Sequence, residues 1–274
     1  MTEQGKCDYQ RFKGEVVIPF VLIVVVSFVA SGLTLFSGFG LGTILMPAFA
    51  LFFPIELAIT LTAIVHLLNN IFKLFLVGRR ADRRIVLLFG VPALLAALIG
   101  AKVLVWCDRF APWLQYELGG REFAITPVKV LIAVLIIAFT ALELSPRFAR
   151  AAFDKKYLPL GGAVSGFFGG VSGHQGALRS AFLIKYDLPK EVYIATGVVI
   201  ACLVDVSRIS VYATHLSSQN LQAHIPLLSA AVVSAFAGAW LGNRLIKKIT
   251  LPFVQWLVSG MLIVVALLLG LGLI

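Results

Sequence analysis

Long apolar runs separated by short polar segments dominate this chain of 274 residues. The runs cover residues 16–36, 43–53, 56–77, 85–106, 126–144, 158–171, 176–184, 190–212, 224–243 and 252–274. Most of them approach the roughly 20 residues that a membrane-spanning helix requires. The runs 43–53 and 176–184, and with them 158–171, are too short to span comfortably. The pattern predicts an all-α polytopic membrane protein.

Two glycine-rich breaks interrupt this pattern, and a short apolar run follows each of them. The first break contains Gly38, Gly40 and Gly42, and the second covers residues 169–176. Each glycine costs a helix interior about 1 kcal/mol relative to alanine, so we expect broken or re-entrant helical hairpins over 16–53 and 158–184. Backbone that is irregular at membrane depth must be buried in protein or line a cavity, and the start of a helix there can bind an anion.

Composition and charge narrow the class further. The chain is 60% hydrophobic and 13% charged, with a mean hydropathy of +0.98, which excludes a soluble domain. The net charge of +10 comes from Lys and Arg clustered in short loops, as membrane orientation requires, so we expect no nucleic-acid partner. No cleavable signal peptide is expected. Cys7, Cys107 and Cys202 lack metal-type spacing and are expected to be buried or free thiols.

Loop charges predict the orientation. Loops 78–84, 145–157 and 244–250 are rich in Lys and Arg and should be cytoplasmic, whereas loops 107–125 and 213–223 should face outward. Both chain ends are then outside, provided that each short run returns the chain to the face from which it came. We expect an outer N-terminal segment at 1–15, a first unit at 16–144, a cytoplasmic linker at 145–157 and a second unit at 158–274.

The two units resemble each other in sequence. A shift of 135 residues brings Ser37 onto Ser172, Gly38 onto Gly173, Pro54 onto Pro189, Glu56 onto Glu191, Asn70 onto Asp205 and Lys73 onto Arg208. The first unit begins outside and the second inside, so we predict two inverted-topology repeats, each a hairpin followed by three spanning helices. Such repeats are typical of secondary transporters, with the site near the midplane. The alternative is a duplication without a transport role.

Several polar side chains fall inside spanning runs. His66, Asn69, Asn70 and Lys73 lie on one stripe of the 56–77 helix, and Asp205 precedes Arg208 by three residues on the matching helix. Polar groups at such depth usually face a bundle interior or a cavity. The alternative for Lys73 and Arg208 is that they reach back to the membrane surface from a helix end.

The second break carries side chains that packing alone does not explain. His174 and Gln175 stand where the first break has Phe39 and Gly40, so we expect them to contact a substrate. His174 could also carry a coupled proton, because its unperturbed pKa of about 6.5 is near working pH. Arg179 is either a second anion contact or a residue that reaches the cytoplasmic surface.

No catalytic motif is present. The chain has no Gly-x-Ser-x-Gly, no His-Glu-x-x-His and no phosphate-binding loop, so we expect neither an enzyme nor a cofactor, metal site or ATP-driven pump. Three rivals to a carrier stay open: an anion channel, a non-transporting membrane receptor or assembly subunit, and a membrane-embedded enzyme.

These features together resemble the TauE/SafE family of sulfite and organosulfonate permeases. The stretch Ser37-Gly-Phe-Gly-Leu-Gly-Thr-Ile-Leu-Met-Pro47 carries the likeness, and residues 165–176 repeat it in weaker form. Ala177 and Phe182 stand where the family would place Gly and Pro, which points to a subgroup with its own substrate. The resemblance implies export or uptake of small sulfur-containing anions across the bacterial inner membrane by a homodimer in contact with lipid.

We therefore predict a carrier that moves sulfite or a short organosulfonate by alternating access. The alternatives are a channel for similar anions and a carrier of another small organic anion. Substrate-binding residues are predicted at Ser37, Gly38, Gly40, Asn70, Ser172, Gly173, His174, Gln175 and Arg208. Lys73, Asp205 and Arg179 are predicted to have coupling or secondary roles.

Overall fold

The computed structural model describes residues 3–34, 40–77, 80–145, 147, 153–216, 224–245 and 251–274. Helices make up most of these residues, which confirms the predicted all-α polytopic class. The elements follow in order: α1 (Glu3–Thr34), α2 (Leu41–Ala50), α3 (Ile55–Val77), α4 (Arg83–Ile85), the π-helical turn η2 (Val86–Gly90), α5 (Val91–Cys107), β1 (Leu114–Leu118), β2 (Arg121–Ile125), α6 (Pro127–Leu144), the 3₁₀ turn η3 (Lys155–Tyr157), α8 (Leu158–Ser172), α9 (Gly176–Leu183), the 3₁₀ turn η4 (Ile184–Tyr186), α10 (Lys190–Leu216), α11 (Ile225–Leu245) and α12 (Leu251–Gly270).

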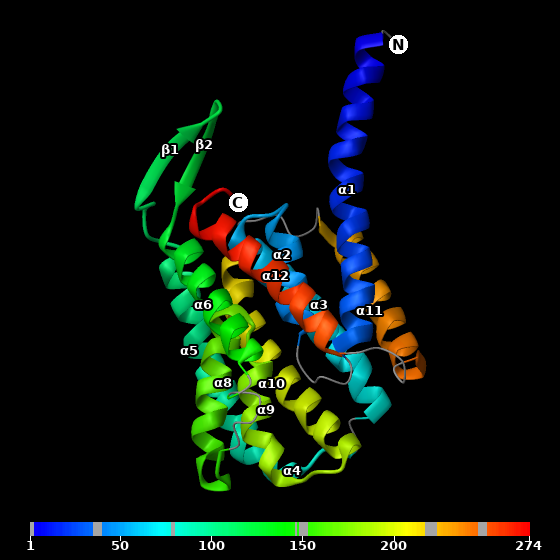
Figure 1. The fold of residues 1–274 in the computed structure, drawn as a ribbon, viewed down its shortest axis with the longest axis vertical. Helices are drawn as coiled ribbons and strands as arrows, with labels where there is room; N and C mark the ends of the chain where they lie inside the picture. Colours follow the sequence, from blue (N-terminus) through cyan, green and yellow to red (C-terminus); the bar gives the residue numbers. More distant parts are fainter. Residues whose placement is uncertain are drawn as a thin grey trace.

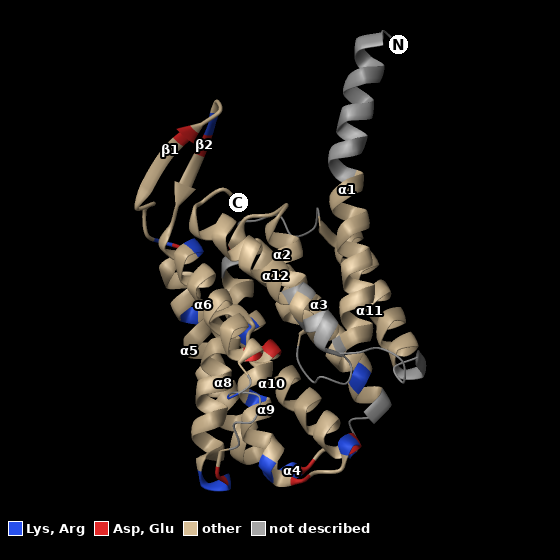
Figure 2. Cartoon of the chain, in the orientation of Figure 1, with Lys and Arg blue, Asp and Glu red and all other residues tan. Residues whose placement is uncertain are grey.

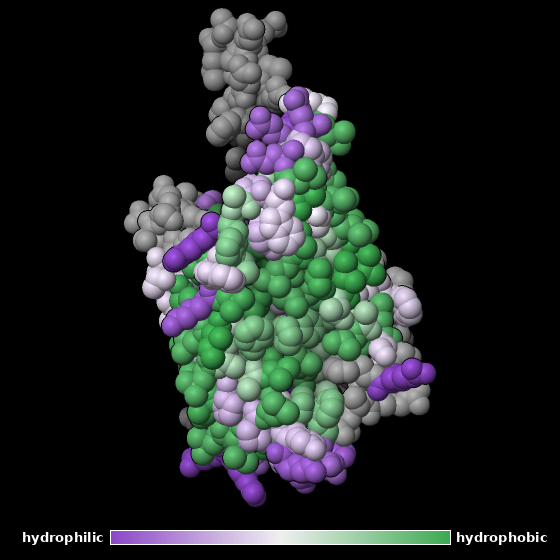
Figure 3. Space-filling model, turned by 90° about the vertical axis from the view of Figure 1, so that its left-hand side faces the viewer, coloured by the Kyte–Doolittle hydropathy of each residue, from purple (hydrophilic) through white to green (hydrophobic). Residues whose placement is uncertain are grey.

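Five helical segments within the described ranges are long and apolar enough to cross a membrane. They are Ile55–Phe75, Arg83–Asp108, Pro127–Leu144, Lys190–Thr214 and Ile225–Gly242. Figure 3 shows a broad hydrophobic belt across one face, with hydrophilic residues at its two ends. Charged residues likewise gather near the two ends of the bundle, and only a few lie between them (Figure 2). The chain therefore has the surface of a multi-pass membrane protein.

α3 and α10 cross in the middle of the bundle (Figure 1). α1 packs along α11 on one flank, α5 packs along α8 on the other, and α6 packs along α12. The β1–β2 hairpin and the C-terminus lie at one end of the molecule, and α4 lies at the opposite end. Below, these are called the hairpin end and the α4 end.

The β1–β2 hairpin is a feature that the hydrophobic pattern did not predict. It occupies most of loop 107–125 and pairs Leu114 with Ile125 and Leu118 with Arg121. Gly119 and Gly120 connect the strands at φ values of 62° and 76°. Two successive positive φ angles suit the tight turn that matches strand twist, so the Gly-Gly pair was the available signal.

The second glycine-rich break produces a hairpin of helices. α8 begins directly after η3, and α9 ends where η4 returns to the same end: Lys185 Nζ donates to Asp154 Oδ1 at 2.6 Å, and the rings of Phe153 and Phe182 stack at 4.4 Å. Eight residues of α9 cannot cross a membrane. The short run 176–184 therefore turns back rather than spans.

The end of α2 lies at the hairpin end. The Phe53 ring meets the His224 ring edge-on at 5.2 Å, and the Glu56 side chain shares a hydrogen bond with Asp108, which follows α5. α2 contains ten residues and is also too short to span. The helical backbone of α1 begins at Glu3, so residues 3–15 of the segment that the sequence set apart as polar are helical.

Corresponding helices in the two units begin at the same offset. α2 begins at Leu41 and α9 at Gly176, and α3 begins at Ile55 and α10 at Lys190, so each pair differs by 135 residues. The packing has the same correspondence, because α1 lies on α11 just as α8 lies on α5. These observations favour two repeats, and their inverted relation stays a prediction.

α8 approaches the η2–α5 segment so closely that backbone touches backbone. Gly162, Gly166 and Gly170 follow one another every four residues and lie on one face of α8. A Cβ on any of the three would collide with main-chain atoms, at Phe89, Ala93 and Ala97 in turn. Small residues at this spacing are typical of tightly associated membrane helices.

Candidate functional site

The polar residues of α3 and α10 meet where the two helices cross. Asp205 is fully buried, and its Oδ1 accepts two hydrogen bonds from Arg208, one from Nε at 3.0 Å and one from Nη2 at 2.8 Å. Arg208 is itself 1% exposed. The spacing of three residues places both side chains on the same face of α10.

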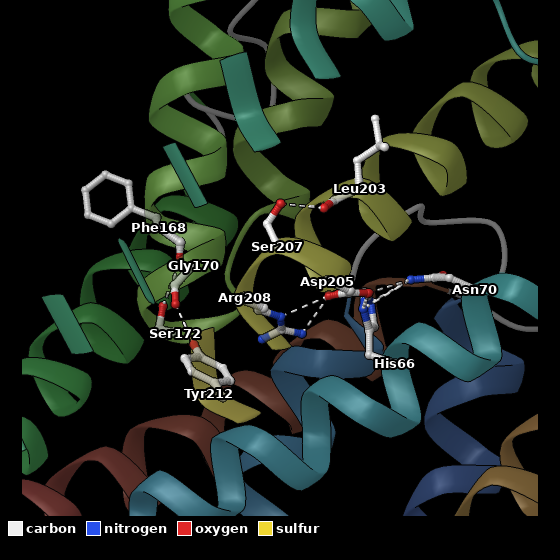
Figure 4. Close-up of polar contacts among 10 residues, drawn as sticks. All are labelled: His66, Asn70, Phe168, Gly170, Ser172, Leu203, Asp205, Ser207, Arg208 and Tyr212. Carbon is white, nitrogen blue, oxygen red and sulfur yellow. Dashed lines mark hydrogen bonds and ion pairs between the residues drawn. The ribbon is translucent and has the colours of Figure 1, made fainter. Parts of the chain in front are cut away.

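His66 and Asn70 approach the same carboxylate from α3 (Figure 4). His66 Nδ1 lies 2.6 Å from Asp205 Oδ2, and Asn70 Nδ2 lies 3.3 Å from that oxygen. Asp205 therefore accepts from both helices. Two ring contacts, at 3.1 Å to Nδ1 and 3.4 Å to Nε2, also join Asn70 Nδ2 to His66. We call His66, Asn70, Asp205 and Arg208 the central cluster.

The second break reaches this cluster through Gly173. Gly173 ends α8 with a φ of 82°, a left-handed conformation that L side chains rarely adopt. A Cβ at this position would lie 2.8 Å from Arg208 Nη1. Tyr212, one turn beyond Arg208, hydrogen-bonds to Arg208 and donates to the Gly170 carbonyl. The Arg208 guanidinium is thus held between Asp205 and the tip of the break.

His174 and Gln175 follow Gly173 and point polar atoms into buried space. His174 is 4% exposed, stacks on Phe139 at 5.5 Å and uses Nδ1 in a 3.0 Å contact with Ser172 Oγ. Gln175 is 2% exposed. His174 Nε2 and both amide atoms of Gln175 have no hydrogen-bond partner among the described residues. Buried polar atoms are nearly always paired, so these three await a ligand or water.

The first break meets the second at His66. Ser37 and Gly38 lie outside the described residues. Gly40 precedes α2 with a φ of 116°, and its carbonyl accepts from Ile44 N at 2.9 Å. A Cβ on Gly42 would lie 3.7 Å from His66 Cδ2 and 3.9 Å from the Gly173 carbonyl oxygen. The start of α2 and the end of α8 therefore lie next to each other.

Two further buried cations are connected to the central cluster, Arg179 through Asp205 and Lys73 through Arg179. Lys73 and Arg179 are each 5% exposed, so neither side chain reaches the surface of the protein. Arg179 lies against α10, where a Cβ on Gly197 would be 3.4 Å from its Nε. Its charge acts on Lys73 and on Asp205. The described residues of the predicted site thus lie in the central cluster, in the two breaks or, for Lys73 and Arg179, within the electrostatic reach of a neighbour.

Comparison with known proteins identifies the family. The model of the family described as "Sulfite exporter TauE/SafE" matches residues 23–269. This chain belongs to the TauE/SafE family. Its members are sulfite or organosulfonate exporter-type transporters rather than enzymes, so the TauE/SafE chain described here is a multi-pass membrane transporter. No curated protein and no solved structure matches it.

Sequence reasoning did not assign His66 and Tyr212 to the site of this TauE/SafE protein. His66 stood on the polar stripe of its helix, but nothing in the sequence showed that Asp205 faces it across the bundle. Tyr212 lies four residues after Arg208, and that spacing was the signal that could have found it.

Proposed function

We propose that this TauE/SafE chain is a secondary carrier that moves sulfite or a short organosulfonate by alternating access. The observation that carries the proposal is the buried charge where the two breaks meet. Among the described side chains that are buried, the charged ones are Lys73, Arg179 and Arg208 against Asp205 alone. An excess of two positive charges inside protein is costly unless an anion neutralises it.

Donors that such an anion would need lie beside the Gly173 tip. Gln175 Nε2 and His174 Nε2 have no partner among the described residues. Arg208 Nη1 lies next to Gly173, and its planar guanidinium suits the oxygens of a sulfite or sulfonate group. Ser172 orients His174. Backbone N–H groups at the start of α2 would face the same anion, since a helix N-terminus favours negative charge. Ser37 and Gly38 would complete this side.

The paired architecture supports the proposal of alternating access. Two short helices, α2 and α9, approach one place from opposite ends of the bundle, which is the arrangement of inverted-repeat carriers with a midplane site. We propose that movement of one part of the bundle against another exposes the site to each side in turn. Residues 16–144 and 158–274 would be the two repeats.

We also propose the cellular setting. The α4 end, which includes Arg83, Arg84, Lys155 and Lys156, would face the cytoplasm of a cell with this protein in its inner membrane, and both termini would face outward. A homodimer is the proposed assembly, as the family resemblance implies. Cysteine labelling from either side of sealed vesicles, with Asp154→Cys and Glu117→Cys, distinguishes this orientation from the reverse.

A pair of variants tests the anion site. Gln175→Leu removes an amide that has no partner, so the empty protein should be as stable as the wild type or more stable, while sulfite binding weakens by about tenfold or more. Arg208→Ala should abolish binding, although leaving Asp205 short of a partner also costs stability, by about 3 kcal/mol. Arg84→Ala, an exposed arginine at the α4 end, is the matched control.

The measurements are thermal stabilisation of the purified protein by sulfite, sulfate, taurine and sulfoacetate, and exchange of radiolabelled sulfite in proteoliposomes. Wild-type exchange that saturates at carrier-like rates supports the proposal. Currents that fail to saturate would indicate a channel. If Gln175→Leu binds and exchanges sulfite like Arg84→Ala, the site is elsewhere.

A further inference from the structure

His66 lies between the acid of the central cluster and the meeting point of the two breaks. Its Nδ1 lies 2.6 Å from Asp205 Oδ2, and its ring edge faces Gly42 beside the Gly173 carbonyl. The side chain is 14% exposed, whereas Asp205 is fully enclosed. An ionisable group with one side exposed and the other against a buried carboxylate can exchange a proton.

The geometry identifies the nitrogen that exchanges it. An ionised carboxylate only accepts hydrogen bonds, so Nδ1 carries its hydrogen toward Asp205 in both states of the ring. The neutral and cationic forms then differ only at Nε2, which lies 3.4 Å from Asn70 Nδ2. In the neutral ring this nitrogen accepts from the amide. In the cationic ring it has become a donor.

The charged and titratable groups of the network that contains His66 come from several elements. α10 contributes Asp205, Cys202, Arg208 and Tyr212, α3 contributes Lys73, and the α8–α9 tip contributes His174 and Arg179. α2 and the described side chains of α11 contribute no titratable group. Asp205 is therefore the one anion in this set, and His66 is bonded to it.

His174, which the sequence suggested as a proton carrier, lies in a different environment. It stacks on Phe139, its Nδ1 is used by Ser172, and the nearest charge acting on it is the Arg208 guanidinium. No carboxylate contacts it among the described residues. A neutral imidazole suits a role as hydrogen-bond donor to an anion, and His66 has the partner that a cationic ring requires.

Arg208 links the proton site to the anion site. The Nε and Nη2 edge of the guanidinium donates to Asp205, and Nη1 lies next to Gly173. An anion at the tip partly neutralises the charge of Arg208. The negative charge of Asp205 is then less compensated by Arg208, so it stabilises an imidazolium at His66 more strongly. The anion also attracts the imidazolium directly. Binding of either species thus favours the other, and this coupling is reciprocal.

We propose that His66 binds a proton together with the substrate anion, so that the carrier moves one proton with each anion. The proton adds to Nε2 from the side to which the tips are open and leaves Nε2 on the other side with the anion. This proton site deepens the proposed function and rests on it, because the coupling needs an anion beside Gly173.

Calorimetry on the purified, intact protein tests the coupling. Sulfite binding is measured in two buffers of different ionisation enthalpy, at an alkaline pH where sulfite carries no proton of its own. The wild type should take up close to one proton per anion. His66→Gln keeps an amide that can donate to Asp205 but cannot titrate, so it should bind sulfite with no linked proton. His224→Gln, whose histidine packs on Phe53 at the hairpin end, should behave like the wild type.

A spectroscopic readout keeps the wild type informative if His66→Gln does not fold. In protein with ¹⁵N-labelled histidine, addition of sulfite at constant pH should convert one imidazole from the neutral to the cationic pattern, and His224→Gln should leave that change in place. The proton site is overturned, while the anion carrier stands, if sulfite binds without proton uptake or without a change in any histidine signal. It is also overturned if His66→Gln takes up as many protons as the wild type. Absence of any sulfite binding or exchange defeats the carrier itself, and the proton site with it.

Discussion

α3 and α10 carry different chemistry at equivalent positions of two helices that start 135 residues apart. Where α10 has Asp205 and Arg208, α3 has Asn70 and Lys73. Asn70 and Asp205 also touch each other, at 3.3 Å. Positions that correspond in two halves and meet at their contact cannot both hold ionised carboxylates, because repulsion between like charges so close keeps one of them protonated. An amide opposite the carboxylate avoids that repulsion where the two helices meet.

The first test makes the two helices alike. Asn70→Asp places a second carboxylate against Asp205, and we expect the free energy of unfolding to fall by about 3 kcal/mol, with loss of sulfite exchange. Asn70→Ser removes the amide without adding charge and should cost about 1 kcal/mol. Chemical or thermal unfolding in detergent measures both. Equal stability and exchange in the two variants would show that charge at this contact is unimportant.

A smaller effect is expected from the turn that distinguishes the second break. Gly173→Ala forces a side chain into a left-handed conformation, at a cost of about 1–2 kcal/mol, and pushes its Cβ against Arg208 Nη1. Sulfite affinity should fall as well, which calorimetry measures. Gly260→Ala is the matched control, because a Cβ there meets nothing within 4 Å. Unchanged sulfite affinity in Gly173→Ala would show that Arg208 does not contact the bound anion.

The smallest effect concerns how each hairpin is anchored. The α9 side is held by the ion pair of Lys185 and Asp154, whereas ring contacts hold the α2 side. Lys185 holds the pKa of the exposed Asp154 carboxyl below its usual range, so this support is present above about pH 4 and is lost as the pH falls further. Asp154→Asn should lower the Tm by less than about 2 °C at neutral pH and by nothing at low pH. A larger drop would mean that the pair fixes the hairpin.

The fold class followed from the sequence because apolar runs of spanning length leave few alternatives. The two short helices after the glycine-rich breaks were predicted for the same reason. Whether they span was decided by their lengths and by the contacts after each, Lys185 with Asp154 after α9 and Phe53 with His224 after α2. The β1–β2 hairpin was missed because its strands are only five residues long and lie in a polar loop between apolar runs. The alternation of apolar and polar residues in β1 and the Gly119-Gly120 pair were the signals that could have found it.

The candidate site was predicted in part. Matched positions singled out Asn70, Asp205 and Arg208, and their proximity was unknown until both helices were seen to cross. His66 was missed as a partner of Asp205, because a spacing of 139 residues carries no signal about contact. The buried state of Lys73 and Arg179 was open too, since a long side chain can snorkel or turn inward.

The glycine face of α8 has a mechanical consequence. Because backbone rests on backbone along Gly162, Gly166 and Gly170, α8 and the η2–α5 segment cannot slide past each other without steric collision, and they must travel as one rigid body. Any rearrangement that opens the site then has to occur along other seams, where side chains can repack. Gly173, at the end of α8, therefore moves together with this rigid body.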